Sequence, residues 1–267
     1  IWGTKLGGGW EHRVITIDGS QGEGGGQVLR SSLTLSVMTG QPIHIQNIRA
    51  RRSKPGLMHQ HLQAVKAAAA ASKASLSGAF LGSMELQFEP GEITSGRFKF
   101  DIGTAGAATL VLQTIFLPLS FAGSASTVII TGGTHVPWSP CYHYLEELWL
   151  PCLKKLGFDA RLSLEAAGFY PQGNGRIQAT IRPVEHIFPL QLTRRGDLQS
   201  ITGVTGVANL EISIADRQRR QALQRLESTV SGKRPPNIRT ERMPGKFKGT
   251  VLLLCAEFDP GRACFFG

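Results

Sequence analysis

The order in which short apolar segments follow one another restricts the fold of this chain more than any other feature. From residue 14 to residue 102 the pattern predicts strands and helices in the order β-α-β-α-β-β. The expected strands cover residues 14–17, 43–48, 83–89 and 97–102, and the expected helices cover residues 27–39 and 57–72. Helices that alternate with strands bury one apolar face on a sheet, so the pattern indicates a mixed α and β unit.

A second run of segments repeats this order at a similar length. It predicts helices at residues 109–121 and 142–156 and strands at residues 127–131, 160–165 and 175–181. A recurring order of elements indicates duplicated units, each of which buries a helical face on its own sheet.

A third unit is expected to begin with strand-like sequence at residues 190–205 and to be interrupted by an insert. The insert is predicted to contain a highly charged helix at residues 216–228 and strands at 237–242 and 249–257. We therefore expect an α+β protein of tandem βαβαββ repeats with a smaller α/β insert domain in the third repeat. The expected boundaries are a tail at 1–13, repeats at 14–104 and 105–185, the start of the third repeat at 186–207, and an incomplete insert domain at 208–267.

A glycine-rich turn joins the first expected strand to the first expected helix. Residues 18–27 read DGSQGEGGGQ, and consecutive glycines let a ligand approach the backbone closely. The helix start offers unpaired N–H groups and the positive end of the helix dipole, which together bind anions. Glu23 and Arg30 flank this position. The turn therefore predicts a phosphate site; the alternative is a turn that only lets the helix pack close to the sheet.

Four cations follow the second expected strand within six residues: Arg49, Arg51, Arg52 and Lys54. Arginine binds phosphate oxygens through paired N–H donors. If the first two strands are neighbours, this loop faces the same edge as the glycine-rich turn, and the two form one phosphate site. A lone run of charges is otherwise typical of a solvated surface.

Further candidates lie at helix starts and in later loops. Gln60 and His61 begin the second helix, where His61 is either a proton donor to a phosphate or a surface or capping residue. Gln113 lies in an apolar helix, where a buried amide needs hydrogen-bond partners, and it either bonds backbone or contacts a ligand. In a Gly- and Pro-rich loop, His135 and Trp138 either stack on a base or close the loop.

Composition and charge favour a polyanionic partner. The net charge is +10 and the isoelectric point is near 9.8, which is typical of proteins that bind nucleic acid or nucleotides. No apolar segment is long enough to span a membrane, and residues 1–13 lack the apolar centre of a secretory signal. The four cysteines form no Cys-x-x-Cys pair and are expected to be reduced thiols. We therefore expect a cytoplasmic protein without a membrane partner; the sequence specifies no oligomeric state.

Several of these segments resemble the signature motifs of the RNA 3′-terminal phosphate cyclases. The matching strings are residues 17–32 (IDGSQGEGGGQVLRSS), 48–57 (IRARRSKPGL), 60–62 (QHL), 132–134 (GGT) and 168–171 (GFYP). They keep the family's order and spacing from about residue 14 to residue 188, and more weakly to the end. The resemblance implies βαβαββ repeats arranged as a prism, with the insert domain inside the third repeat.

The resemblance also implies an activity of the ATP-dependent ligase class and the residues that carry it. Such enzymes use ATP and a divalent metal, Mg²⁺ or Mn²⁺, to convert an RNA 3′-phosphate to a 2′,3′-cyclic phosphate. A histidine attacks ATP to form a covalent adenylate, AMP passes to the RNA 3′-phosphate, and the neighbouring 2′-hydroxyl then displaces it. The matching positions are Glu23 for the metal or the ATP phosphates, Gln113 and Pro140 for the nucleotide, and Arg30, Arg49, Arg52 and Gln60 for the RNA 3′-phosphate.

One position of the family pattern has no counterpart. The adenylated histidine of these enzymes follows the insert, and no histidine of this sequence takes its place by spacing. The resemblance therefore predicts an incomplete chain that does not form the adenylate alone.

Two other functions compete with the cyclase. The first is the non-catalytic, cyclase-like ribosome-assembly protein, which binds RNA or protein partners. Because a scaffold has less need of an intact phosphate site, the retained Glu23, Arg30, Arg49 and Arg52 favour the enzyme. The second is a generic basic RNA-binding module, which explains the charge but not the combined motifs.

Overall fold

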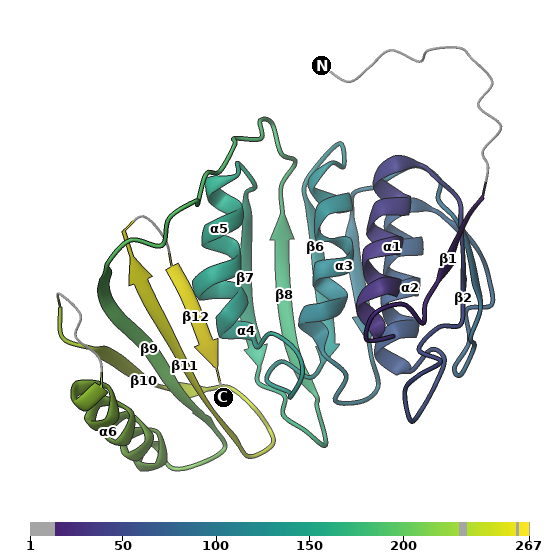
Figure 1. The fold of residues 1–267 in the computed structure, drawn as a ribbon. Helices are drawn as coiled ribbons and strands as arrows, with labels where there is room; N and C mark the ends of the chain where they lie inside the picture. Colours follow the sequence, from purple (N-terminus) through teal and green to yellow (C-terminus); the bar gives the residue numbers. More distant parts are fainter. Residues whose placement is uncertain (1–13, 230–233, 260–261, 267) are drawn as a thin grey trace.

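The computed structural model describes residues 14–229, 234–259 and 262–266. Within them the chain forms three four-stranded sheets that lie side by side, with helices packed against them (Figure 1). The protein is therefore of the α+β class, as the alternating pattern predicted.

The first sheet has the strand order β1-β2-β4-β3. Strands β1 and β2 pair in parallel, and β4 pairs antiparallel with both β2 and β3. Side chains along β4 alternate between buried and exposed, because one face of the sheet packs on the helices. The elements are β1 Ile15–Asp18, α1 Gly26–Thr39, β2 Ile43–Gln46, α2 His59–Ser72, β3 Ser75–Ser77 and β4 Leu86–Glu89.

The second sheet has the corresponding order, β5-β6-β8-β7, with the same parallel and antiparallel pairings. Its elements are β5 Arg97–Asp101, α3 Ala108–Ser120, β6 Ser126–Gly132, α4 Tyr142–Tyr144, η1 Leu145–Trp149, α5 Leu150–Lys155, β7 Ala160–Ala166 and β8 Gly175–Ile181. The helix expected over residues 142–156 thus contains a π-helical turn. The N–H of Leu150 donates to Leu145 O, five residues earlier, beside Pro151, which has no N–H to donate.

Two strand assignments differ from the sequence expectation. The segment expected to close the first unit is β5, which instead pairs in parallel with β6 at the edge of the second sheet. The first sheet is closed by β3, which the sequence analysis missed. This strand has three residues and is exposed at every position, so it carries no apolar alternation. The domain boundaries themselves stay predictions.

The third sheet has the order β10-β9-β11-β12. Its long strand β9 pairs in parallel with β10 and antiparallel with β11, so it belongs to the same sheet as the strands expected in the insert. The assignment of this sheet to an insert in a third repeat stays a prediction. The elements are β9 Leu198–Ala208, α6 Ile212–Thr229, β10 Asn237–Met243, β11 Gly249–Phe258 and β12 Arg262–Phe266.

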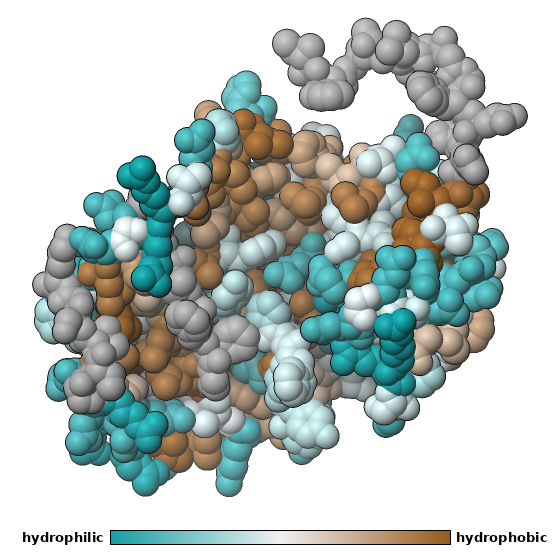
Figure 2. Space-filling view, viewed as in Figure 1, coloured by the Kyte–Doolittle hydropathy of each residue, from teal (hydrophilic) through white to brown (hydrophobic). Residues whose placement is uncertain are grey.

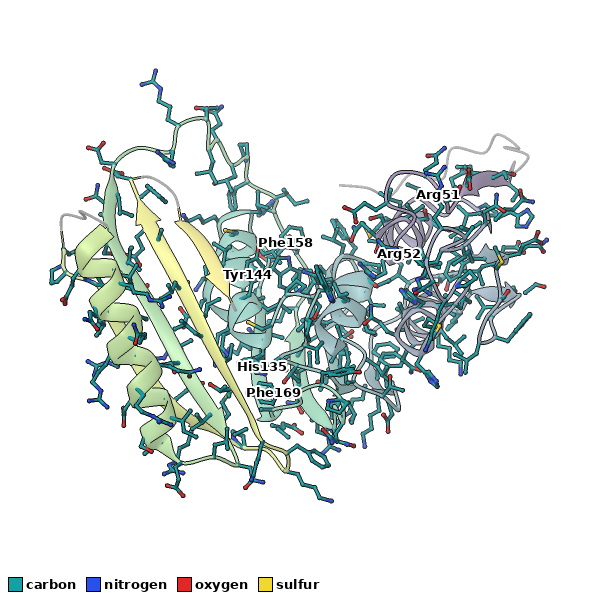
Figure 3. The ribbon with its side chains drawn as sticks, turned by 60° about the horizontal axis from the view of Figure 1, so that its bottom comes forward. Arg51, Arg52, His135, Tyr144, Phe158 and Phe169 are labelled. Atoms are coloured by element: carbon teal, nitrogen blue, oxygen red, sulfur yellow. The ribbon has the colours of Figure 1, made fainter. Side chains whose placement is uncertain are left out.

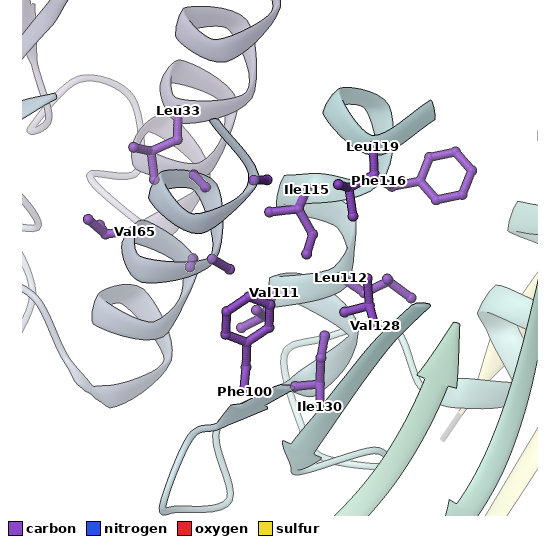
Figure 4. Packing of buried hydrophobic residues seen from close by; sticks show 14 of the residues in the cluster. Leu33, Val65, Phe100, Val111, Leu112, Ile115, Phe116, Leu119, Val128 and Ile130 are labelled. Carbon is purple, nitrogen blue, oxygen red and sulfur yellow. The ribbon is translucent and has the colours of Figure 1, made fainter. Parts of the chain in front are cut away.

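The main hydrophobic core joins the first two units. Helix α3 lies between α1 and α2 on one side and the second sheet on the other, as Figure 4 shows. Val111, Leu112 and Ile115 on this helix are fully buried, and they belong to one buried apolar cluster with Leu33 of α1 and Val128 of β6. The two units are therefore held together by one continuous apolar core.

The cysteines depart from the expectation of four reduced thiols. Cys255 on β11 is disulfide-bonded, whereas Cys141 and Cys152 are free. In the backbone register of β11 and β12, Cys255 lies opposite Cys264, a proximity that arises from strand pairing and not from a sequence motif. Among the described residues, no helix has both the length and the apolar character needed to cross a membrane.

Candidate functional site

The glycine turn (residues 18–27) and the arginine loop (residues 49–56) lie at one edge of the first sheet. Each follows a strand of the parallel pair β1 and β2, so both leave the sheet at its carboxyl-terminal edge. A Cβ added at Gly19 would lie 3.0 Å from the carbonyl oxygen of Gln46 at the end of β2. The prediction that the two segments face the same edge is confirmed.

Arg52 brings the arginine loop against the glycine turn. Its Nη2 atom lies 3.5 Å from Oε2 of Glu23, and a Cβ added at Gly25 would lie 3.1 Å from the same nitrogen. Figure 3 shows Arg51 and Arg52 on the first unit, and Figure 2 shows hydrophilic side chains gathered over the lower part of this unit. Both members of the ion pair are substantially exposed, so its own contribution to stability is small.

The start of α1 faces two nitrogen-bearing side chains. Gly25 occupies the N-cap without a side-chain cap, so the first N–H groups of the helix receive no hydrogen bond from it. A Cβ at Gly26 would collide with His61 Nε2 and would lie 2.8 Å from Arg30 Nη1. Backbone N–H groups, an imidazole and a guanidinium therefore converge where the helix dipole is positive, which is an arrangement suited to an anion.

Arg30 and Arg49 are cations without a carboxylate partner among the described residues. Arg30 Nη2 donates to Gln27 Oε1 at 3.0 Å, and burial lowers the pKa of Arg30. Arg49 Nη1 donates to the carbonyl oxygens of Lys54 and Gly56 at 2.7 and 2.9 Å, which closes the arginine loop. Burial, and secondly repulsion from Arg52, lowers the pKa of Arg49. An oxyanion that binds here would relieve this repulsion.

The sequence analysis left the role of His61 open between a proton donor and a surface or capping residue. His61 is 8% exposed, and Nδ1 accepts the backbone N–H of Met58 at 3.3 Å, so the neutral ring carries its proton on Nε2, the atom that faces Gly26. Burial, and then the charges of Arg49 and Arg30, lower the pKa of His61 to about 3. The ring is therefore a neutral hydrogen-bond donor directed at the helix start.

Gln60 connects this site to the second unit. Its Oε1 accepts the N–H of Ala107 at 2.7 Å, just before α3 begins. A Cβ at Gly106 would lie 2.9 Å from Gln60 Cβ, so the two chain segments are in close contact. The assignment of Gln60 to the phosphate-binding residues stays a prediction.

Gln113 lies in the same groove as Arg30. This groove has a volume of about 270 Å³ between α1 and α3, and Gln27, Thr34 and Leu117 also line it. Pro140 accepts the hydroxyl of Thr109 on its carbonyl oxygen at 2.8 Å, and Thr109 lies one helical turn before Gln113. The structure thus brings Gln113 to Arg30, and it places Pro140 at the beginning of the same helix.

Glu23 faces Arg52 of the arginine loop, and 93% of its side chain is exposed. Among the described residues, no group of three or more His, Cys, Asp or Glu side chains is arranged to hold a metal ion. Mg²⁺ is commonly held by one or two carboxylates together with the phosphates of a substrate. Glu23 therefore fits a metal shared with a nucleotide, and it does not fit a metal held by protein ligands alone.

These features define an α+β protein in which backbone N–H groups, guanidinium groups and an imidazole gather at the carboxyl ends of parallel strands. A family model for RNA 3′-terminal phosphate cyclase matches residues 21–261. The chain is 44% identical over 254 residues to the RNA 3′-terminal phosphate cyclase of Ralstonia nicotianae, covering 95% of this chain and 72% of that protein. It is 46% identical over 258 residues to that of Methylococcus capsulatus, covering 92% and 70%, and 42% identical over 250 residues to that of Archaeoglobus fulgidus, covering 94% and 74%. The chain belongs to the RNA 3′-terminal phosphate cyclase family.

Proposed function

We propose that this chain binds the phosphorylated 3′ end of RNA and acts in its ATP-dependent conversion to a 2′,3′-cyclic phosphate. The observation that carries the proposal is the contact of Arg52 with the glycine turn, at the uncapped start of α1. Guanidinium groups and helix N–H groups are the donors that proteins use for phosphate oxygens. Family membership supports the same function.

The chemistry divides between two groups of residues. In the proposed reaction a histidine takes AMP from ATP and pyrophosphate leaves, and a 3′-phosphate oxygen then displaces the histidine and takes up AMP. The neighbouring 2′-hydroxyl finally attacks the phosphorus of the 3′-phosphate, loses its proton and releases AMP. Arg30, Arg49 and Arg52 hold the phosphate and offset its negative charge as the hydroxyl approaches. Gln113 and Pro140 contact the nucleotide. A divalent metal, Mg²⁺ or Mn²⁺, would neutralise the nucleotide phosphates beside Glu23.

We further propose that neither His61 nor His135 is the histidine that receives AMP. His61 Nδ1 is occupied by a backbone N–H, and His135 is 6% exposed between Thr134 and His143. Neither ring is placed as an accessible nucleophile. If the chain is incubated with α-labelled ATP and acid-labile label appears on His61 or His135, this assignment is wrong.

A non-catalytic, RNA-binding function is the second candidate. It would need the basic edge but not the groove between α1 and α3. The placement of Gln113 beside Arg30 in that groove favours the enzyme, because it supplies a nucleotide contact next to the phosphate contacts. A cytoplasmic location stays a prediction.

Arg52→Ala should weaken binding of 3′-phosphorylated RNA while leaving ATP binding nearly unchanged. Loss of hydrogen bonds to a charged phosphate should reduce RNA affinity about 10- to 100-fold. Fluorescence anisotropy with labelled RNA and calorimetry with ATP and Mg²⁺ would give both affinities. Lys54→Ala is the matched control, because it removes an exposed charge from the same loop. Equal losses of RNA and ATP affinity in Arg52→Ala would contradict the assignment of this loop to the RNA end.

A further inference from the structure

Two aromatic side chains to which the proposed function assigns no role lie open to solvent on loops of the second unit. Trp138 is 100% exposed and Tyr170 is 73% exposed. Trp138 also has a backbone φ of +64°, in the left-handed region that a bulky side chain rarely adopts. A large aromatic residue that is fully exposed and held in a costly backbone conformation points to a binding role.

The loops that carry these residues are bonded to each other. The N–H groups of Thr134 and His135 both donate to the carbonyl oxygen of Gly168, at 2.9 and 3.0 Å. The His135 ring stacks on Phe169, with ring centroids 5.2 Å apart, as the two labelled side chains in Figure 3 indicate. Both His135 and Phe169 are buried. The exposed Trp138 and Tyr170 therefore lie on loops whose inner residues are packed against each other.

A third loop adds positive charge beside the first two. The carbonyl oxygen of Pro244 accepts the N–H of Ala167 at 2.6 Å, and a Cβ at Gly249 would collide with the ring of Phe169. Between these two contacts lie Lys246 and Lys248, which are exposed. The three loops therefore combine exposed aromatic rings with cations.

A cavity of about 430 Å³ opens next to Trp138. Its walls come from the Trp138 loop, including Pro137 and Cys141, and from Thr250 and Val251 on β11. An apolar hollow beside an exposed indole can accept a flat ring that stacks on that indole. This geometry fits an unpaired nucleobase.

The aromatic loops lie on the same edge as the phosphate site. Gln60, beside that site, bonds Ala107, and the neighbouring N–H of Ala108 donates to Gly133 O at 2.8 Å. Gly133 is next to Thr134, so hydrogen bonds connect α2 through the loop before α3 to the Trp138 loop. The loop before α3 and the Trp138 loop follow β5 and β6, which pair in parallel as β1 and β2 do, and the Tyr170 loop follows β7. An extended strand that begins at the arginine loop can therefore continue over the second unit.

We propose that Trp138 and Tyr170, with Lys246 and Lys248, form a stacking platform for unpaired nucleotides on the 5′ side of the RNA terminal phosphate. Aromatic faces that stack on bases, next to cations that attract the backbone, are the usual means of binding single-stranded RNA without strict sequence preference. The platform rests on the proposed function, because it extends the RNA held at the phosphate site. It makes affinity depend on RNA length as well as on the terminal phosphate.

The test compares two unstructured RNAs of different length, a 3′-phosphorylated dinucleotide and a 3′-phosphorylated ten-nucleotide strand. Trp138→Ala should weaken binding of the longer RNA about tenfold, since base stacking on an aromatic residue contributes roughly 1–3 kcal/mol. Affinity for the dinucleotide should stay the same. Trp138→Phe should keep most of the affinity, and Phe80→Ala, which removes an exposed aromatic ring from the first unit, is the matched control.

The outcomes separate this inference from the function on which it rests. If wild type prefers 3′-phosphorylated over 3′-hydroxyl RNA but Trp138→Ala binds the longer strand as wild type does, the platform is refuted and the function stands. Equal weakening of both RNAs in Trp138→Ala would also refute the platform. If wild type shows no preference for the 3′-phosphate, the function itself fails. Quenching of Trp138 fluorescence by the longer RNA alone, absent in Trp138→Phe, would support the platform.

Discussion

Replacing Gly26 with alanine is expected to reduce the affinity for 3′-phosphorylated RNA by about 100-fold or more, through loss of several charge-assisted hydrogen bonds at once. The added methyl group would meet His61 Nε2 and Arg30 Nη1 together. Because these atoms come from two different helices, one or both side chains must leave the start of α1. The single substitution Gly26→Ala therefore removes both the space for the phosphate and the hydrogen-bond donors that would hold it.

Fold stability should change much less than RNA affinity, although the buried His61 must shift to admit the methyl group. Alanine favours a helix over glycine by about 1 kcal/mol in a helix interior, so the helix itself should not suffer. Gly123→Ala is the control, since a Cβ there meets no atom within 4 Å. Anisotropy with labelled RNA and urea unfolding should be measured on both variants. A Gly26→Ala protein that binds phosphorylated RNA like wild type would show that the helix start is not the phosphate site.

Lowering the pH from 7 to 5 is expected to remove about 2 kcal/mol from the free energy of unfolding for each of two buried histidines, His61 and His135. Burial, and then the neighbouring His143, lowers the pKa of His135 from 6.5 to about 3. Between these values the unfolded chain takes up a proton that the folded chain does not, so stability falls as the pH falls. Below about pH 3 the loss from this residue is complete.

The surroundings of His135 explain why it stays neutral. Thr134 Oγ1 lies 2.7 Å from its Nδ1, and His143 Nδ1 lies 2.9 Å from its Nε2. The other ring nitrogen of His143 lies 2.6 Å from Glu241 on β10, so the nearest carboxylate is directed at His143 and not at His135. Arg239 also approaches Glu241, at 3.6 Å. The hydrogen bond from His143 holds the pKa of Glu241 below its usual range, so its contribution is lost only at more acidic pH.

Urea unfolding at pH 7 and pH 5 tests this expectation. His135→Asn should shrink the difference between the two pH values by about half, because one of the two histidines whose pKa is lowered to about 3 is removed. His186→Asn replaces an exposed histidine and serves as the control. For each variant, the free energy of unfolding at pH 5 is compared with that of the same variant at pH 7. The loss of stability that the substitution itself causes then cancels. A free energy of unfolding that does not change between pH 7 and pH 5 would contradict the burial of neutral His135.

Much of the fold follows from local pattern. The alternating apolar residues of β4 predict a strand directly, because β4 buries one face. The long apolar run of α3 predicts a helix, because α3 buries nearly all of its surface. The pattern cannot show which sheet a short strand joins. Strand β5 was therefore assigned to the wrong neighbour, and the exposed β3 was not found at all.

The candidate site, like the fold, could be predicted from the sequence only in part. That the glycine turn and the arginine loop meet could be predicted, because the carboxyl ends of two parallel strands lie at one edge. The role of His61 could not, because its significance depends on Gly26, which reaches it only through the packing of α1 on α2. Likewise His143 and Glu241 are 98 positions apart and meet only when the third sheet packs on the second unit.

The most direct test of a phosphate held jointly by the glycine turn and the arginine loop is an NMR titration with 3′-phosphorylated RNA. The backbone N–H signals of Gly24, Gly25 and Gly26 and the side-chain Nε–H signal of Arg52 would be followed together. We expect all four to shift with one dissociation constant, and to shift little with 3′-hydroxyl RNA of the same sequence. If only the arginine signal moves, or if both RNAs shift the four signals equally, the two segments do not share a phosphate.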